Sequence, residues 1–122
     1  GLGDVYKRQG KDIVMMQEEI DNLHMDDAII EYITMLSFAT RQNPLIELGV
    51  SPRGSIALAG MSKARAYISG RTYVTPEDVQ SIFKDVAGHR IILNPRAKIS
   101  SVTIDEVIDN IFRTVPVPRA MR

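Results

Sequence analysis

Residues 51–70 read SPRGSIALAGMSKARAYISG and carry signals for both the start and the end of a helix. Ser51 can accept hydrogen bonds from free backbone N–H groups, and Pro52 suits the first helical position because its φ angle is already helical. Gly70 is a typical left-handed residue just beyond a last turn. Small residues recur between these ends, at Ala57, Ala59, Gly60, Ala64 and Ala66. The segment therefore predicts a helix over residues 51–69 that a neighbouring helix can approach closely.

Helical periodicity continues on both sides of this segment. Apolar residues at spacings of three and four predict four more helices, over residues 12–23, 26–41, 75–88 and from 103 through 112. Asp26 and Thr75 are the predicted N-caps of two of them, and Thr103 with Glu106 has the spacing of a capping box. Asn43-Pro44 ends the second predicted helix.

Two short segments lack helical periodicity. Ile91-Ile92-Leu93, which Asn94-Pro95 ends, predicts an extended or irregular stretch near residues 90–95. Residues 71–74 are too few for more than an isolated bridge. The expected fold is therefore all-α, a single domain that forms a five-helix bundle with one short extended segment.

Length and composition agree with one soluble globular domain. The chain has 122 residues and 13.6 kDa, with 44% hydrophobic and 25% charged residues, which is typical of soluble globular proteins and excludes disorder. Residues 1–10 share no periodicity with the rest and are predicted to be a non-native leader. The domain is expected over residues 11–118, followed by a tail at 119–122.

The sequence excludes several function classes. The chain has no cysteine, and His24 and His89 lie far apart without nearby carboxylate patterns, so neither thiolate chemistry nor a metal site is expected. No apolar run approaches the roughly 20 residues of a membrane span, and the N-terminus lacks a signal peptide. The chain is therefore expected to be cytoplasmic, with no membrane span.

Charge is distributed unevenly along a chain whose formal net charge is zero. Residues 1–35 hold eight acidic and three basic residues, whereas residues 36–76 hold one acidic residue, Glu47, and five basic ones. The basic residues are Arg41, Arg53, Lys63, Arg65 and Arg71. The middle third could therefore form a local anion-binding face, or the basic side chains could lie scattered on a solvated surface.

Arg53 has the sharpest physical rationale for a ligand. It lies in the first turn of the predicted helix, where backbone N–H groups and the positive end of the helix dipole attract phosphate oxygens, and a guanidinium there is unfavourable without an anion. Arg53 could instead pair with an acid such as Glu47 or point into water. No Walker A loop, GxSxG or HExxH motif is present, so no independent active site is expected.

The motifs also resemble those of a known family. They are, in order, Ala39-Thr40-Arg41, Leu48-Gly49-Val50-Ser51-Pro52-Arg53, Ala64-Arg65-Ala66, Gly70-Arg71, Tyr73-Val74-Thr75-Pro76-Glu77-Asp78-Val79, His89-Arg90 and Val115-Pro116-Val117-Pro118. Together they resemble the C-terminal lid domain of MoxR-type AAA+ ATPases. The resemblance covers nearly all of residues 11–118, with the motifs in the family order.

The resemblance implies a role for the start of the predicted helix. Arg53 would be the sensor 2 arginine, reaching with Ser51 and Pro52 toward ATP, whose Mg²⁺ is held by a separate nucleotide-binding domain. Family members are thought to form ring oligomers, expected to be hexameric, and to act as chaperone-like factors on partners with von Willebrand A domains. The catalytic core is missing from this chain, which should hydrolyse no ATP alone.

Other interpretations remain open. A helix-turn-helix over residues 52–69 and 76–88 would bind DNA, but Glu77 and Asp78 stand where a recognition helix needs bases, so no nucleic-acid partner is expected. The chain could also be a stand-alone protein-interaction adaptor.

The remaining matched residues are expected to be structural. Arg41 would cap the second helix, Gly70 would supply a left-handed turn, and His89-Arg90 would satisfy terminal carbonyls. Tyr32 and Tyr67 could stack on adenine, but aromatic residues on helix faces are more often part of the core.

Overall fold

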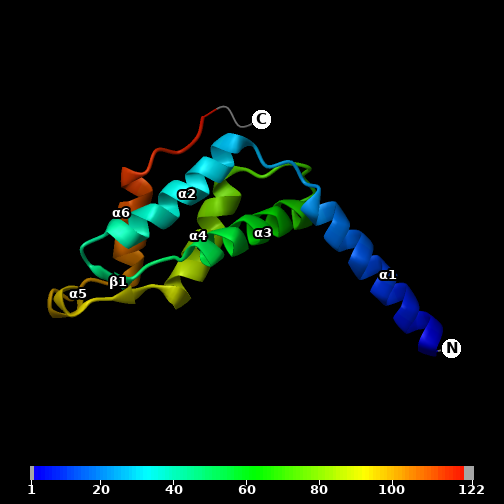
Figure 1. The fold of residues 1–122 in the computed structure, drawn as a ribbon, viewed down its shortest axis with the longest axis horizontal. Coiled ribbons are helices and arrows are strands. Elements are labelled where there is room, and N and C mark those ends of the chain that lie inside the picture. Colours follow the sequence, from blue (N-terminus) through cyan, green and yellow to red (C-terminus); the bar gives the residue numbers. More distant parts are fainter. Residues whose placement is uncertain (1, 120–122) are drawn as a thin grey trace.

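The computed structural model describes residues 2–119, and it describes side chains from Asp12 onward. The elements in chain order are α1 (Leu2–Asp21), α2 (Asp27–Gln42), β1 (Ile46–Leu48), α3 (Pro52–Ile68), α4 (Pro76–Arg90), β2 (Ile92–Leu93), α5 (Pro95–Ile99) and α6 (Ile104–Thr114). Helices α2, α3, α4 and α6 form the body, and α1 extends away from it (Figure 1). The predicted all-α class is confirmed.

The helix starts follow their predicted caps. Asp26 accepts a hydrogen bond from the Ala28 N–H at 2.9 Å and precedes α2. Thr75 and Asp78 form a reciprocal capping box at the start of α4. Thr103 caps α6 by accepting a hydrogen bond from the Glu106 N–H. The predicted capping box is incomplete within the described residues, because the Glu106 side chain accepts no hydrogen bond from the Thr103 N–H. The sequence rules for helix starts therefore hold, apart from that one bond.

The turn after α3 is also as predicted. Gly70 has a φ of 80°, in the left-handed region that glycine adopts without strain. Its N–H donates to the Tyr67 carbonyl at 2.9 Å, and the Arg71 N–H donates to the Ala66 carbonyl at 3.0 Å. Beyond this turn, Tyr73 forms an isolated parallel bridge with His24, so the expectation of no more than a bridge over residues 71–74 is confirmed.

Three details differ from the expected five-helix bundle. The stretch near residues 90–95 contains β2, which pairs antiparallel with β1, a strand that the sequence did not predict. The short helix α5 follows it, so the described residues hold six helices rather than five. In addition, helix α4 continues past Gly88, where the sequence predicted its end, to Arg90. The start of α5 resembles that of α3, because the Asn94 side chain accepts a hydrogen bond from the Ala97 N–H at 3.0 Å and Pro95 takes the first helical position.

The predicted leader is continuous with the predicted domain. Helix α1 runs without interruption from Leu2 across Lys11 to Asp21, so the structure has no break at the expected domain start. Gly1 and residues 120–122 of the expected tail lie outside the described residues. The non-native origin of residues 1–10 stays a prediction.

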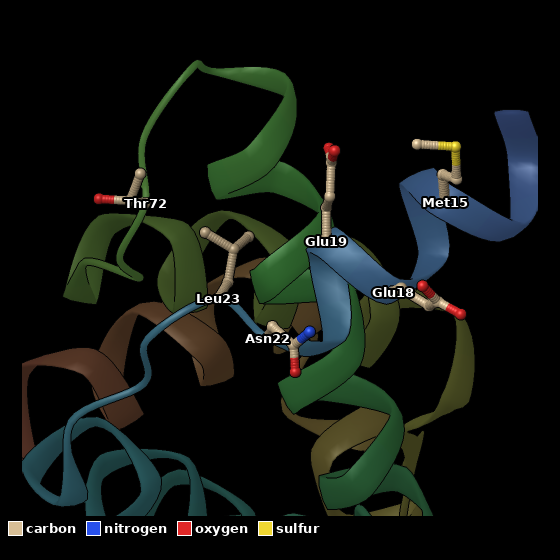
Figure 2. A pocket seen from close by; sticks show the side chains of 6 residues that line it. All are labelled: Met15, Glu18, Glu19, Asn22, Leu23 and Thr72. Carbon is tan, nitrogen blue, oxygen red and sulfur yellow. The ribbon is translucent and has the colours of Figure 1, made fainter.

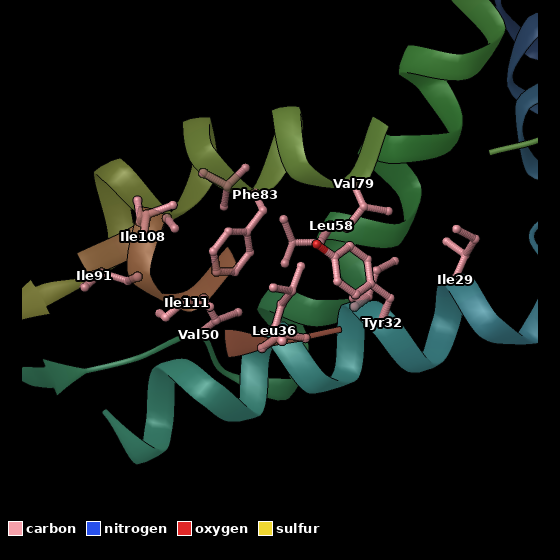
Figure 3. Close-up of a cluster of buried hydrophobic side chains, with 14 of the residues drawn as sticks. Ile29, Tyr32, Leu36, Val50, Leu58, Val79, Phe83, Ile91, Ile108 and Ile111 are labelled. Atoms are coloured by element: carbon pink, nitrogen blue, oxygen red, sulfur yellow. The ribbon is translucent and has the colours of Figure 1, made fainter. Parts of the chain in front are cut away.

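The core lies where α2, α3, α4 and α6 meet (Figure 3). Phe83 of α4 packs against Phe112 of α6 with ring centroids 5.6 Å apart. Tyr32 of α2 is buried in the same cluster, and its hydroxyl accepts a hydrogen bond from the Gln80 side chain at 3.0 Å. The core therefore fixes α3 against α2 and α4, which sets the direction in which the first turn of α3 points.

Candidate anion-binding site at the start of α3

A buried hydroxyl positions the chain just before α3. Thr40, near the end of α2, accepts a hydrogen bond from the Val50 N–H at 2.8 Å and donates one to the Ser37 carbonyl at 2.6 Å. Thr40 is fully buried, so the bond to Val50 is shielded from water and strengthened. It holds residue 50 one position before the helix cap at Ser51.

The first turn of α3 has the geometry that the sequence predicts. Ser51 accepts a hydrogen bond from the Gly54 N–H at 3.1 Å, and Pro52 occupies the first helical position. Gly54 is buried against Val50, and a Cβ at Gly54 would lie only 2.8 Å from the Val50 Cγ1. The side of the turn that carries Gly54 therefore faces the core, and Arg53 next to it is exposed.

Two other arginines bind a buried acid that the sequence did not reveal. Arg65 of α3 and Arg71 after the turn both form ion pairs with Asp78, which is fully buried. Burial alone raises the pKa of this carboxyl, but hydrogen bonds from the Thr75 N–H, Arg71, Arg65 and the Thr75 hydroxyl outweigh it and hold the pKa below its ordinary value. Asp78 therefore stays ionised and joins α3 to α4.

The other basic residues of the middle third also have protein partners. Lys63 donates to the Asp21 carbonyl at 3.2 Å, which attaches α3 to the end of α1. Arg41 donates to the Val50 carbonyl at 3.4 Å rather than capping its own helix, so the expected capping role is wrong. Among the described residues, Arg53 is the one basic side chain of residues 36–76 that has neither a hydrogen bond nor an ion pair, with Glu47 or any other acid.

The middle third is therefore not a broad anion-binding face. Four of its five basic residues, namely Arg41, Lys63, Arg65 and Arg71, are used within the domain. Arg53 remains available at a helix N-terminus, where the dipole and free backbone N–H groups favour a negative charge. The arrangement can bind a phosphate or carboxylate group that comes from outside the described residues.

Two hollows show what surrounds this helix. One of about 290 Å³ lies beside the start of α3 and is lined by Leu48, Gly49, Val50, Ser51, Gly54 and Arg90. Another of about 400 Å³ lies past the opposite end of α3, where α1 meets the turn after Gly70, and is lined by Met15, Glu18, Glu19, Asn22, Leu23 and Thr72 (Figure 2). The second hollow contains none of the predicted site residues.

His89-Arg90 at the end of α4 and the tyrosines Tyr32 and Tyr67 were the other residues with predicted roles. Within the described part of the chain, neither the His89 nor the Arg90 side chain donates a hydrogen bond to a carbonyl at the end of α4, and the Ile91 N–H donates to the Ala87 carbonyl instead. Tyr32 is a core residue, whereas Tyr67 donates its hydroxyl to Glu19 of α1 at 2.6 Å. The hydroxyls of Tyr32 and Tyr67 therefore both have a partner within the domain.

The described side chains form no metal-binding cluster. Over residues 12–119, no group of histidine and acidic side chains has an arrangement that could hold a metal ion. None of the helices in the described range is long and apolar enough to cross a bilayer.

Comparison with known proteins identifies a family. Residues 38–111 match the family model of the AAA lid domain. The chain is 40% identical over 108 residues to the uncharacterized protein YeaC of Bacillus subtilis, covering 88% of this chain and 34% of that protein. It is 29% identical over 117 residues to Chaperone MoxR1 of Mycobacterium tuberculosis, and the match covers 88% of this chain and 31% of that protein. It therefore spans about a third of the length of these curated relatives.

Two further matches agree with this result. The chain is 36% identical over 75 residues to Protein MoxR of Methylorubrum extorquens, covering 61% of this chain and 22% of that protein. The fold matches the crystal structure of a protein provisionally named an ATPase from Cytophaga hutchinsonii, with a TM-score of 0.76, 32% identity, and coverage of 84% of this chain and 34% of that chain. The chain belongs to the AAA lid domain family and is a lid domain of the MoxR type.

Proposed function

We propose that this chain is the sensor 2 lid of a MoxR-type AAA+ ATPase, in which Arg53 contacts the γ-phosphate of ATP. The observation that carries the proposal is that Arg53 is exposed and unpaired among the described residues. Its side chain is exposed in the first turn of α3, and it has no partner among the described residues although the other four basic residues of the middle third do. An unpaired guanidinium at a helix N-terminus is favourable when an anion binds there.

The chemistry of the donor set fits a triphosphate. Arg53 offers a planar, permanently charged fork that can bind two phosphate oxygens at once and can stabilise charge on a transferring phosphoryl group. Ser51 and Pro52 shape the turn that presents it. The nucleotide-binding domain, which this chain lacks, would bind the Mg²⁺ and the rest of the nucleotide. This chain alone is therefore expected to hydrolyse no ATP.

The same contact can link nucleotide state to movement. Arg53 holds the lid toward the nucleotide while the γ-phosphate is present and loses that contact after hydrolysis, so the lid can rotate relative to the nucleotide-binding domain. We propose that the full-length protein forms a hexameric ring and uses this rotation to remodel client proteins with von Willebrand A domains. The name Chaperone MoxR1 of one relative supports the chaperone-like part of this proposal.

The direct test is Arg53→Ala in the full-length ATPase that carries this lid. Steady-state ATP hydrolysis is expected to fall by about a hundredfold, since removal of one preorganised donor to a developing charge has an effect of that size. The matched control is Arg113→Ala, because Arg113 is also exposed and lies in the last turn of α6. Normal turnover in the Arg53→Ala protein would remove the sensor role.

A stability measurement on this 122-residue chain completes the test. Arg53 is exposed, and Arg53→Ala removes no hydrogen bond or ion pair among the described residues, so the thermal midpoint is expected to stay within about 2 °C of the parent chain, as for most surface substitutions. Loss of hydrolysis with an unchanged midpoint separates a role at the nucleotide from a role in folding.

A further inference from the structure

The hollow of about 290 Å³ beside the start of α3 lies where the end of β1, the first turn of α3 and the end of α4 meet. Arg90, the last residue of α4, reaches it because β2 follows that helix closely and pairs with β1, with Ile92 opposite Leu48. The residues that line the hollow are Leu48, Gly49, Val50, Ser51, Gly54 and Arg90. Arg90 is the one charged residue of this lining, which contains no acidic side chain.

The position of Arg90 is not explained by its own helix. Arg90 is exposed, and its guanidinium has no hydrogen bond or ion pair with a described residue. A basic residue in a last turn is ordinarily attracted to the terminal carbonyl groups of that helix. Among the described residues, Arg90 donates to none of those carbonyls, and its side chain lines a hollow at the start of another helix instead.

The surroundings of the hollow add positive charge rather than neutralise it. Arg41 donates to the carbonyl of Val50, a lining residue, at 3.4 Å. Glu47 is the acidic residue next to the lining in sequence, but it is exposed, does not line the hollow and forms no ion pair with a described residue. Two guanidinium groups therefore border the hollow without a paired carboxylate, which favours an anion from outside.

Hydrogen-bond donors are present at the same place. Within the described part of the chain, the N–H groups of Gly49 and Ser51 donate to no protein acceptor. The Ser51 hydroxyl accepts a hydrogen bond from the Gly54 N–H at 3.1 Å, which leaves its own proton free to be donated. Arg90 adds a planar fork that can bind two oxygen atoms of one phosphate group. A hollow with these donors and no acidic side chain fits an oxyanion.

The proposed ligand of Arg53 indicates which oxyanion this is. Ser51 lines the hollow and also caps the turn that carries Arg53, so the hollow adjoins that turn. If Arg53 binds the γ-phosphate, the other two phosphate groups of the same nucleotide are joined to it and lie close to this turn. ATP therefore brings further negative charge to the place where Arg90 is unpaired.

We propose, on the basis of the proposed function, that Arg90 binds a phosphate group that ATP and ADP share, whereas Arg53 binds the γ-phosphate that only ATP has. Hydrolysis then removes the partner of Arg53 but not that of Arg90. The lid keeps one contact with the nucleotide after hydrolysis, and it rotates while Arg90 remains bound.

Nucleotide binding by the full-length ATPase that carries this lid tests the proposal. Dissociation constants of mant-ADP and of the non-hydrolysable mant-AMPPNP are measured for Arg90→Ala by fluorescence titration with Mg²⁺ present. Lys84→Ala is the matched control, because Lys84 is also an exposed basic residue of α4 and does not line the hollow. The thermal midpoint of the 122-residue chain with Arg90→Ala should stay within about 2 °C of the parent chain, as for most surface substitutions.

The expected result is weaker binding of both nucleotides. Arg90→Ala should raise both dissociation constants about tenfold, because a charge-assisted hydrogen bond is lost in each complex. Arg90→Lys should restore part of the affinity for both, since lysine keeps the charge without the planar fork. Arg53→Ala should raise the dissociation constant of mant-AMPPNP alone, and Lys84→Ala should change neither.

Three outcomes would overturn the proposal. Unchanged dissociation constants in Arg90→Ala would mean that no nucleotide phosphate binds at the hollow. Weaker binding of mant-AMPPNP alone would mean that Arg90 acts on the γ-phosphate. A lowered thermal midpoint would assign the loss of affinity to folding.

The result for Arg90 is distinguishable from the result for Arg53. Loss of turnover in Arg53→Ala together with unchanged nucleotide affinity in Arg90→Ala rejects the second phosphate contact and keeps the sensor role. Weaker binding of both nucleotides by Arg90→Ala together with normal turnover in Arg53→Ala keeps the phosphate contact of Arg90 and rejects the sensor role.

Discussion

Gly49 lies directly against Thr40, although the two residues belong to different segments of the chain. A Cβ at Gly49 would lie 2.8 Å from the Thr40 Oγ1 and 2.9 Å from the carbonyl carbon and oxygen of Thr40. The backbone of Gly49 is therefore as close to the last turns of α2 as its lack of a side chain permits. This contact and the bond from Val50 to Thr40 fix where α3 begins, and with it the position of Arg53.

Gly49→Ala is expected to destabilise this chain. The added methyl group meets backbone atoms of Thr40, which cannot rotate away as a flexible side chain can, so we expect a loss of about 1–3 kcal/mol in the free energy of unfolding. Urea denaturation measures it. The control is Gly88→Ala in α4, where a Cβ meets no atom within 4 Å and should stabilise the helix by about 0.5–1 kcal/mol. Equal effects of both substitutions would contradict the packing argument.

Thr40→Val removes the hydroxyl and keeps a branched side chain of similar shape. The buried Val50 N–H then has no partner, and we expect a loss of about 1–3 kcal/mol in unfolding free energy. Thr40→Ser keeps the hydroxyl and loses one methyl group, so it should cost only about 0.8 kcal/mol. Urea denaturation that ranks the Val variant as more stable than the Ser variant would show that the hydrogen bond does not hold this segment.

Local signals account for the parts of the fold that the sequence predicts well. Ser51, Thr75 and Gly70 act within three or four residues of themselves, and the structure has them in the predicted roles. Strand β1 is short and depends on pairing with β2, from which α3 and α4 separate it along the chain, so no local pattern predicts it. Asn94-Pro95 has the chemistry of a helix start, but the same pair is typical of the end of an extended segment, so α5 was not predicted.

At the candidate site too, the sequence predicts the local features and not those that depend on how the helices pack. The position of Arg53 in a first turn follows from Ser51-Pro52 alone, and so does its attraction for anions. Its lack of a partner could not be predicted, because the partners of Arg65 and Arg71 depend on how α3 packs against α4. Asp78 lies in the first turn of α4, where an acid is common at the surface, and nothing nearby in sequence indicates that it is fully buried.

Asp78 should make the stability of the domain sensitive to acid. Its pKa is lowered in the folded state, since hydrogen bonds outweigh the effect of burial. The carboxylate therefore stabilises the fold above the pKa of the unfolded chain, about 3.9, and this contribution is lost as the pH falls through the lower folded value. Unfolding free energies measured from pH 7 to pH 2 should decrease below about pH 4.

Asp78→Asn tests the origin of that acid sensitivity. The variant leaves two guanidinium groups without their anion, and we expect it to lose about 2–3 kcal/mol at pH 7, a reduced value because Arg65 and Arg71 stay partly exposed. The unfolding free energy of the variant should also change less between pH 5 and pH 2 than that of the parent chain, because the variant lacks the carboxylate whose pKa folding lowers. Asp109→Asn, on the exposed side of α6, is the control and should keep the acid sensitivity.

Arg53→Lys separates charge from geometry at the proposed nucleotide contact. Lysine keeps the positive charge but lacks the planar fork, so ATP hydrolysis by the full-length ATPase should lie between that of the parent protein and that of Arg53→Ala. The unfolding free energy of this 122-residue chain should change by less than about 0.5 kcal/mol, since Arg53 is exposed and has no hydrogen bond or ion pair with a described residue. Full turnover in the lysine variant would mean that charge alone suffices and would reject bidentate binding by Arg53.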